Sequence, residues 1–232
     1  IKEQTDAEIK KHIIEKNIYG VDIESGAVDI ARLRFWLSLV VDEQNPRPLP
    51  NLDFKIMQGN SLLESYQGVD LSELTKIKSE KEAGVQMTIF DDTLDIHRND
   101  LSKLINSYFN CTNIKEKIAL RQEIDINIRQ QIKEGHFKID LSNINLSANP
   151  YFFLWHTYFV DVFKGANNLD DAGFDIVIGN PPYGAKLSQG DKEVLKRRYL
   201  SAQTVKEVQK GSLNTYTLFI ELGYNLLKKG GN

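Results

Sequence analysis

The sequence predicts an α/β protein with a parallel sheet, and three features of the chain support this fold class. Short apolar runs typical of buried strands recur along the chain, and each ends in polar or turn-forming residues. Segments with helical spacing of apolar residues alternate with these runs between residues 5 and 65. The order helix, strand, helix, strand favours a parallel sheet, because a helix can return the chain between two parallel strands.

Two helices are predicted in the N-terminal part of the chain. Residues 5–16 form the first, because Thr5 and Glu8 have the spacing of a capping box and apolar residues follow at helical intervals. Residues 24–44 form the second, and its apolar residues recur at intervals of three and four along one predicted core face. That face consists of Ile30, Leu33, Leu37 and Val40.

Three strands are predicted from the apolar runs. The first covers residues 17–23, and the second covers residues 54–58 after a proline-rich break at 45–51. The third covers residues 174–178, where the run Ile-Val-Ile stops at Gly179. We expect ligands to meet these strand ends, because binding sites in such sheets lie beyond the carboxyl ends of the strands.

Residues 70–146 differ in character from the segments on either side. They are charged and mostly helix-patterned, which predicts a helical insertion formed by a hairpin of long helices. A solvated linker is the alternative. Residues 1–69 and 147–232 then form one discontinuous core.

The second part of this core contains three more predicted segments. Residues 150–163 are strongly hydrophobic, residues 189–200 form a basic helix, and an amphipathic helix occupies residues 212–232. The face of the last helix that we expect to be buried carries Tyr216, Phe219, Ile220, Gly223, Leu226 and Leu227.

Composition narrows the class of protein. The chain of 232 residues is 41% hydrophobic and 26% charged, which is typical of a globular domain. No apolar run approaches the roughly 18 residues of a membrane span, and the polar first residues predict no signal peptide. The single cysteine, Cys111, excludes an intrachain disulfide and a cysteine-cluster metal site, so we expect a cytoplasmic protein without a metal. The net charge of −3 argues against a protein that coats nucleic acid by charge alone.

The first two strand ends carry polar residues with two interpretations each. Asp22 can accept hydrogen bonds from both ribose hydroxyls of a nucleoside, but an acid is also favoured there by the dipole of the following helix. Taken alone, Asp22 favours the helix-start interpretation. Asn60 can donate to and accept from an adenine edge, and it is equally suited to a turn.

The third strand end carries the most distinctive motif, Asn180-Pro181-Pro182-Tyr183. Two prolines make a stiff extended loop without N–H donors. The side-chain oxygen of Asn180 and the carbonyl of Pro181 are then two acceptors for one exocyclic amino group, which has two hydrogens to donate. Tyr183 supplies a face on which a planar base can stack. A purely structural Pro-Pro turn is the alternative.

This motif after an apolar strand resembles the catalytic motif of S-adenosylmethionine-dependent methyltransferases that act on the N6 amine of adenine. Residues 17–39 resemble the strand and helix that carry the ribose-binding acid of that family, and residues 54–63 resemble the strand end that meets the cofactor's adenine. Residues 214–231 resemble the helix after the motif. Residues 155–184, preceded by the helical insertion, are most similar to fused type IIG restriction–modification enzymes.

The resemblance implies a Rossmann-like (class I) methyltransferase core that binds S-adenosylmethionine. Asp22 would hold the ribose hydroxyls, Ile23 would pack on the cofactor's adenine, and Asn60 with Ser61 would meet its edge. The family often has aspartate where this chain has Asn60, which keeps the acceptor oxygen but loses the charge.

The resemblance also implies a substrate, double-stranded DNA with the target adenine flipped out of the helix. Asn180 and the carbonyl of Pro181 would bind the amino group, Tyr183 would stack on the base, and Pro182 would stiffen the loop. The enzyme would be a site-specific adenine DNA methyltransferase of a restriction–modification system.

One departure from the family is large. The glycine-rich loop after the family's first strand lies against the methionine part of the cofactor, and this chain contains no Gly-x-Gly. We therefore expect a fragment that lacks the first strand and is inactive alone. The rest of the parent polypeptide would supply the glycine-rich loop, a target-recognition domain and, where one is fused, a nuclease domain.

Three other functions stay open. A glutamine side chain presents the same planar NH2 group, so a methyltransferase of the release-factor type fits the motif. An RNA adenine methyltransferase fits it too. A DNA-binding fragment without activity is the third, and the missing glycine-rich loop favours it for this chain. The similarity to type IIG enzymes and the helical insertion argue against the glutamine methyltransferase.

Overall fold

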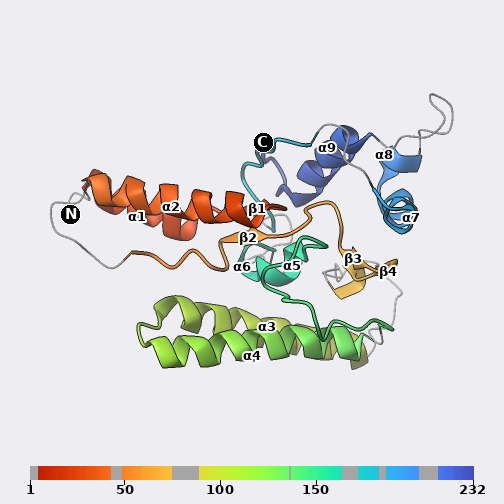
Figure 1. The fold of residues 1–232 in the computed structure, drawn as a ribbon, viewed down its shortest axis with the longest axis horizontal. Helices are drawn as coiled ribbons and strands as arrows, with labels where there is room; N and C mark the ends of the chain where they lie inside the picture. The colour runs from red at the N-terminus through yellow and green to blue at the C-terminus, as the bar shows by residue number, and fades with distance from the viewer. Residues whose placement is uncertain are drawn as a thin grey trace.

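The computed structural model describes residues 5–42, 49–74, 89–135, 137–163, 172–182, 187–203 and 214–232. The described chain is mostly helical with few short strands (Figure 1). Its helices are α1 (Asp6–Lys16), α2 (Ser25–Asp42), α3 (Ile89–Asn110), α4 (Ile114–Glu134), α5 (Trp155–Tyr158), α6 (Val160–Phe163), α7 (Gln189–Arg198), α8 (Leu200–Gln203) and α9 (Thr215–Leu226). Its strands are β1 (Gly20–Asp22), β2 (Ile56–Gln58), β3 (Ser65–Tyr66) and β4 (Val69–Asp70), and a 3₁₀ helix covers Ser72–Leu74. Within these ranges, no helix combines the length and the apolar character needed to cross a bilayer.

The predicted order helix, strand, helix, strand is confirmed in the N-terminal part. α1 begins with the predicted capping box: the Glu8 amide donates to the Thr5 hydroxyl at 3.3 Å, and the Thr5 amide donates to the Glu8 carboxylate at 3.1 Å. β1 and β2 are parallel, with Asp22 paired with Gln58. The carboxyl ends of the two strands therefore lie side by side.

α2 buries a different face from the predicted one. The four side chains of the predicted face are 50–59% exposed; they are Ile30, Leu33, Leu37 and Val40. The other face packs with α1 and β2 in a small separate core. Two anchors hold this face inward, since the Arg32 guanidinium donates to the Ile56 carbonyl at 2.6 and 3.0 Å and the Trp36 indole donates to the Pro50 carbonyl at 2.9 Å. Because α2 is apolar on more than one side, periodicity alone did not identify the buried face.

The third predicted strand is extended, but its prediction as a buried strand was wrong. Residues 174–177 run beside residues 226–232 through backbone hydrogen bonds and one parallel bridge. Ile176 and Ile178 are 64% and 91% exposed. Among the described residues, no other segment pairs with residues 174–178 to form a strand, so the segment lacks the second neighbour that would bury its side chains.

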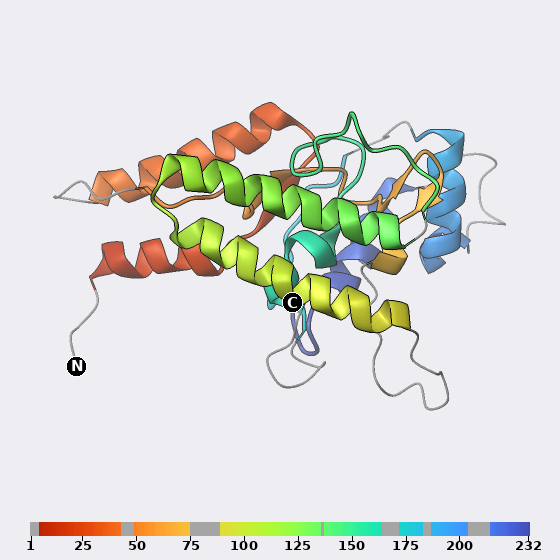
Figure 2. The same ribbon diagram turned by 90° about the horizontal axis from the view of Figure 1, so that it is seen from below.

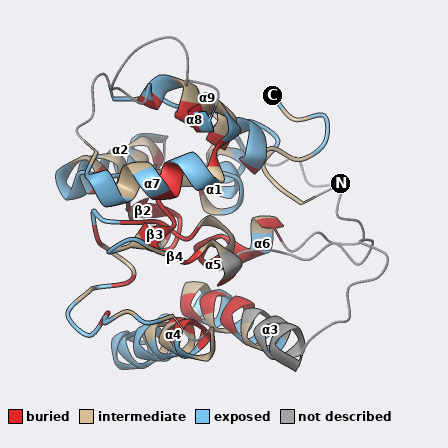
Figure 3. Ribbon diagram, turned by 90° about the vertical axis from the view of Figure 1, so that its right-hand side faces the viewer, coloured by how far each residue is buried: buried red, intermediate tan, exposed pale blue. Residues whose placement is uncertain are grey.

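α3 and α4 form the predicted helical hairpin, which is joined by residues 111–113 and lies along one side of the molecule (Figures 1 and 2). The buried residues of the hairpin face α5 and α6 (Figure 3) and share one hydrophobic cluster with them. The Tyr108 hydroxyl also donates to the Asp53 carboxylate at 2.5 Å. The hairpin is therefore packed and is not a solvated linker. The division of the chain into a core and an insertion stays a prediction.

An aromatic core around α5 joins the N-terminal strand region to the extended segment. The ring of Phe159 lies 4.9 Å from that of Tyr19, which precedes β1, and 5.2 Å from that of Phe153. The Tyr19 ring lies 5.6 Å from that of Phe174, where the extended segment begins. Edge-to-face contacts of this kind add to the stability that comes from burial.

α9 is amphipathic, but its buried side is rotated from the predicted one. Tyr216 and Ile220 are 52% and 56% exposed, although we expected both to be buried. The buried side chains of α9 are Thr215, Leu218, Leu222 and Leu226. The basic helix predicted at 189–200 is present as α7, and Tyr199 separates it from α8.

Candidate active site

Asp22 stands at the carboxyl end of β1, where the chain turns into α2. Its Oδ1 accepts a hydrogen bond from the Glu24 amide at 2.9 Å, and its carbonyl accepts one from the Gly59 amide at 2.9 Å. The side chain is exposed, and Oδ2 has no hydrogen-bond partner among the described residues. One carboxylate oxygen therefore serves the helix start, while the other is available to a ligand.

Ile23 provides apolar surface directly beside this carboxylate. Its side chain is 47% exposed, and its carbonyl accepts a hydrogen bond from the Gln58 side-chain amide at 3.0 Å. Gln58 thus holds the end of the neighbouring strand in place, although it was not among the predicted site residues. An exposed aliphatic side chain on a held backbone suits contact with a flat ring.

Gly59 allows the second strand end to pass close to the aromatic core. A Cβ atom at this position would lie 2.6 Å from Cδ2 of Phe153. Asn60 follows, and its side-chain oxygen accepts from the Leu62 amide at 3.2 Å, as the turn interpretation predicts. Within the described chain, the NH2 group of Asn60 makes no hydrogen bond. The Ser61 carbonyl accepts from the Trp155 indole at 3.0 Å, which fixes the turn to α5.

A cavity of about 380 Å³ opens beside Asn60. Its walls include Tyr66 and Tyr151, whose ring centroids are 5.6 Å apart. Ser188, the N-cap of α7, and Asp191 in the first turn of α7 also line it. The cavity combines aromatic and polar walls, which are the surfaces that a nucleoside requires.

The predicted catalytic residues lie at the end of the extended segment. Asn180 and Pro182 are exposed, and Pro181 is half-buried. In the described part of the chain, neither the Asn180 side chain nor the Pro181 carbonyl has a hydrogen-bond partner, whereas the Pro182 carbonyl accepts from the Thr215 hydroxyl at 3.1 Å. Tyr183 lies outside the described residues.

The structure thus brings four of the predicted site residues together at two neighbouring strand ends. Asp22 and Ile23 end one strand, and Asn60 and Ser61 follow its parallel neighbour. Across the described ranges, no hydrogen bond or ion pair joins Asn180 to any of these four.

A buried ion pair beneath the site was missed in the sequence. Glu64 is 1% exposed, forms an ion pair with Arg198 at the end of α7, and accepts a hydrogen bond from the Trp155 amide at 3.1 Å. Burial raises the pKa of the Glu64 carboxyl, and the charge of Arg198 opposes that effect. The pair fastens α7 to the turn after Asn60. In the sequence, the sign of a buried charge was that Glu64 directly follows two leucines.

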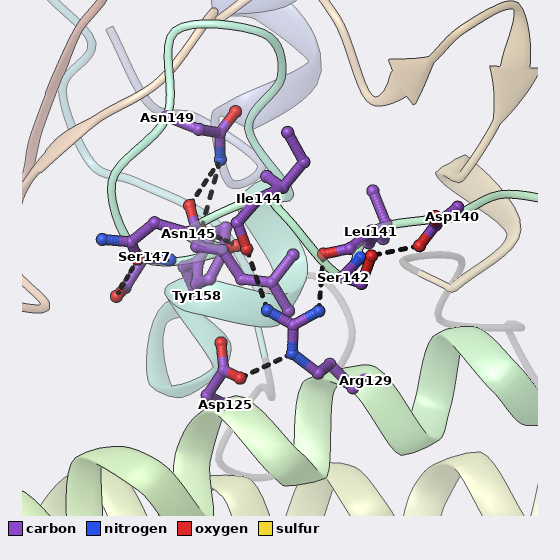
Figure 4. Close-up of polar contacts among 11 residues, drawn as sticks. Asp125, Arg129, Asp140, Leu141, Ser142, Ile144, Asn145, Ser147, Asn149 and Tyr158 are labelled. Carbon is purple, nitrogen blue, oxygen red and sulfur yellow. Dashed lines mark hydrogen bonds and ion pairs between the residues drawn. The ribbon is translucent and has the colours of Figure 1, made fainter.

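A brace from the helical hairpin was also missed. The Arg129 guanidinium donates to the carbonyls of Leu141 and Ile144 at 2.7 and 2.8 Å (Figure 4). The segment that it holds continues to Ala148, which forms a parallel bridge with Gln58. The hairpin therefore supports the end of β2 through this segment.

Comparison with known proteins identifies the family of this chain. The family described as "Eco57I restriction-modification methylase" matches residues 16–232. The chain is 24% identical to a "Putative type II restriction enzyme and methyltransferase" of Methanocaldococcus jannaschii, over 82% of this chain and 20% of the relative. This chain therefore spans about a fifth of the length of that relative. No solved structure matches this chain. Because the family model matches residues 16–232, which is nearly the whole chain, the chain belongs to the Eco57I restriction-modification methylase family.

Proposed function

We propose that this chain is the methyltransferase part of a restriction–modification enzyme, and that it transfers a methyl group from S-adenosylmethionine to the N6 amine of adenine in double-stranded DNA. Membership in the family implies a Rossmann-like DNA methyltransferase. The adenine amine, the extruded base and the cofactor are our proposal. One observation carries it: Asn180 and Pro181 present two acceptors that have no partner among the described residues.

The strand-end residues fit the nucleoside half of the cofactor. Oδ2 of Asp22 is available to ribose hydroxyls, Ile23 presents apolar surface, and the NH2 group of Asn60 is available to an adenine nitrogen. For the methionine half, the sequence offers no Gly-x-Gly loop. We therefore propose that another part of the full-length polypeptide completes the cofactor site, and that this chain alone binds the cofactor weakly.

The residues around the amine would act by position and electrostatics. The lone pair of an adenine amine is delocalised into the ring, which makes the nitrogen a poor nucleophile. Acceptors from Asn180 and Pro181 on its two hydrogens favour a tetrahedral nitrogen and localise that pair. When bound, S-adenosylmethionine supplies a methyl group on a sulfonium sulfur: the nitrogen pair forms the N–C bond, the S–C electrons stay on sulfur, and the extra proton of the amine leaves to water.

The target base must leave the duplex to reach these acceptors. In the proposal, Tyr183 stacks on the extruded base, and its two preceding prolines limit the loop's motion. Base stacking on an aromatic side chain is worth roughly 1–3 kcal/mol. Tyr183→Phe should therefore keep most of the activity, since the face of the ring is what contacts the base.

The test is nucleoside mass spectrometry of DNA from cells that express the full-length polypeptide or its Asn180→Ala variant. N6-methyldeoxyadenosine that disappears in the variant supports the proposal. Methyladenosine confined to RNA, or methylglutamine on a protein, would assign the motif to the alternative substrates. Methylation that persists in a folded Asn180→Ala variant would refute the role of this residue.

A second candidate is a DNA-binding part that has no activity by itself. The missing Gly-x-Gly loop favours it for the 232-residue chain. Titration of this chain with S-adenosylmethionine tests the premise of this candidate: tight, stoichiometric binding would contradict our expectation of an incomplete cofactor site.

A further inference from the structure

We propose that Thr215 is a positioning residue for the Asn180–Tyr183 motif, an inference that rests on the proposed function. The hydroxyl of Thr215 donates to the carbonyl of Pro182 at 3.1 Å. Thr215 is 5% exposed and is the first residue of α9, whereas Pro182 is exposed. A buried hydroxyl at the start of one helix therefore holds the carbonyl of an exposed motif residue.

The proline chemistry of the motif leaves one soft dihedral angle for this bond to control. Each proline ring fixes its own φ at about −65°. A proline also restricts the ψ of the residue before it, which covers ψ of Asn180 and of Pro181. Within the pair Pro181-Pro182, ψ of Pro182 is therefore the backbone angle that no proline restrains.

That angle sets the orientation of the peptide plane between Pro182 and Tyr183. The plane contains the Pro182 carbonyl oxygen and the amide nitrogen of Tyr183, because the peptide bond is planar. A hydrogen bond to the oxygen therefore restricts the rotation of that plane. It also engages the Pro182 carbonyl, so that the carbonyl of Pro181 is the one left for the target amine.

The anchor itself is firmly held. Asn214 caps α9 by accepting from the Tyr216 amide at 3.1 Å, so the helix begins at a defined residue. Leu218, one turn after Thr215, is fully buried. The position of the Thr215 hydroxyl is therefore set by the packing of α9 and not by the loop.

The helix contains a matched control. Thr217 also makes a hydroxyl hydrogen bond, but it donates to the Asn214 carbonyl of its own helix at 2.9 Å. Thr215→Val and Thr217→Val each remove one hydroxyl from the first turn of α9. Only the first removes a contact with the motif, and Thr215→Ser restores it.

The experiment measures single-turnover methyl transfer and cofactor affinity in the full-length polypeptide. We expect Thr215→Val to slow methyl transfer about tenfold, which corresponds to about 1.4 kcal/mol, with cofactor affinity unchanged. Thr215→Ser and Thr217→Val should stay within about twofold of wild type. Because water can replace the hydroxyl at the exposed Pro182 carbonyl, melting temperatures should differ little. Wild-type rates in a folded Thr215→Val variant would overturn the inference.

A double-mutant cycle with Tyr183→Ala tests whether Thr215 acts through the aromatic residue. If it does, Thr215→Val should have little further effect once Tyr183 is absent. Fully additive losses would show a general structural role and overturn the inference.

Should the wild-type polypeptide methylate no DNA, the proposed function fails, but amide exchange of residues 179–188 still tests Thr215. Exchange that is no faster in Thr215→Val than in Thr217→Val would then contradict it.

Discussion

The two halves of the proposed site are held in different ways. At the carboxyl ends of β1 and β2, backbone and side-chain bonds fix each residue: the Asp22 carbonyl binds the Gly59 amide, and the Ile23 carbonyl binds Gln58. At residues 176–182, the first part bonds to the C-terminal residues and the last part is held by Thr215. The cofactor half is therefore organised by the sheet, whereas the substrate half depends on proline stiffness and a few contacts.

This difference suggests how the work is divided. A ribose and an adenine ring need the same groups throughout catalysis, which suits a rigid strand end. A flipped base must enter and leave, which suits a short stiff segment with exposed acceptors. Changes in the strand ends should therefore alter affinity and stability, while changes in the motif should alter the rate.

The largest expected effect is on the motif. In the full-length polypeptide, Asn180→Ala should reduce methyl transfer about a hundredfold or more, because it removes an acceptor from the reacting amine. Cofactor affinity and melting temperature should stay near those of wild type. Asn106→Ala, an exposed asparagine on α3, is the control. A proportional loss of stability and activity would instead support the purely structural Pro-Pro turn.

The next effect concerns Asp22. Asp22→Ala should weaken cofactor binding more than tenfold, because a hydrogen bond to a charged group is worth roughly 1.5–3 kcal/mol. Isothermal titration of the full-length polypeptide measures this. Glu24→Ala removes another exposed acid from the same helix start. Equal, small effects of both variants would mean that Asp22 only favours the start of α2.

Gly59 tests how rigid the cofactor half is. Gly59→Ala should destabilise the chain by about 1–3 kcal/mol, because the added Cβ would lie 2.6 Å from Phe153. Gly26→Ala is the control: nothing lies within 4 Å of its added Cβ, so it should be neutral or stabilising by up to about 1 kcal/mol in α2. Urea unfolding compares them. Equal midpoints would show that the strand end yields easily.

The last expected effect concerns the pH dependence of stability at Lys55, directly before β2. Its side chain is 7% exposed, with Nζ 3.7 Å from the Tyr19 ring centroid, and burial lowers its pKa to about 8. Between about pH 8 and 10.5 the unfolded chain binds more protons than the folded one at this residue, so its contribution to stability rises with pH. The slope of this rise cannot exceed about 1.4 kcal/mol per pH unit.

Lys55→Met should remove that contribution. At pH 7, the free energy of unfolding of Lys55→Met should be larger than that of wild type. This difference should shrink as the pH approaches 10. Lys103→Met is the control, because Lys103 is exposed on α3. Urea unfolding at several pH values measures the difference. Parallel pH profiles for Lys55→Met and wild type would contradict the assigned pKa.

Local chemistry explains which parts of the site could be predicted from the sequence. The neighbouring positions of Asp22 and Asn60 could be predicted because parallel strands end at one edge of a sheet, whereas their proposed roles came from the family resemblance. The stiffness of the motif follows from its prolines. The buried face of α2 could not be predicted, because it is held by hydrogen bonds from Arg32 and Trp36 to carbonyls that lie far along the chain. The contact between Thr215 and the Pro182 carbonyl could not be predicted either, because the two residues lie far apart in the sequence.

The extended segment shows a second limit. The run Ile-Val-Ile has the composition of a buried strand, but burial depends on neighbours that the run itself does not specify. Ile178 is 91% exposed because the described residues provide a partner on one edge alone. Composition predicted the extended conformation correctly and the environment wrongly.

The Arg129 brace has a consequence for how the molecule opens. Residues 141–144 gain two of their carbonyl hydrogen bonds from a guanidinium on α4, so they lose these bonds whenever the hairpin detaches. The same segment pairs with the end of β2 at Ala148. Partial unfolding that begins at the hairpin should therefore spread to the strand end, and the two should exchange amide hydrogens as one cooperative unit. A protein of this build would lose the proposed nucleoside-binding edge whenever its hairpin detaches.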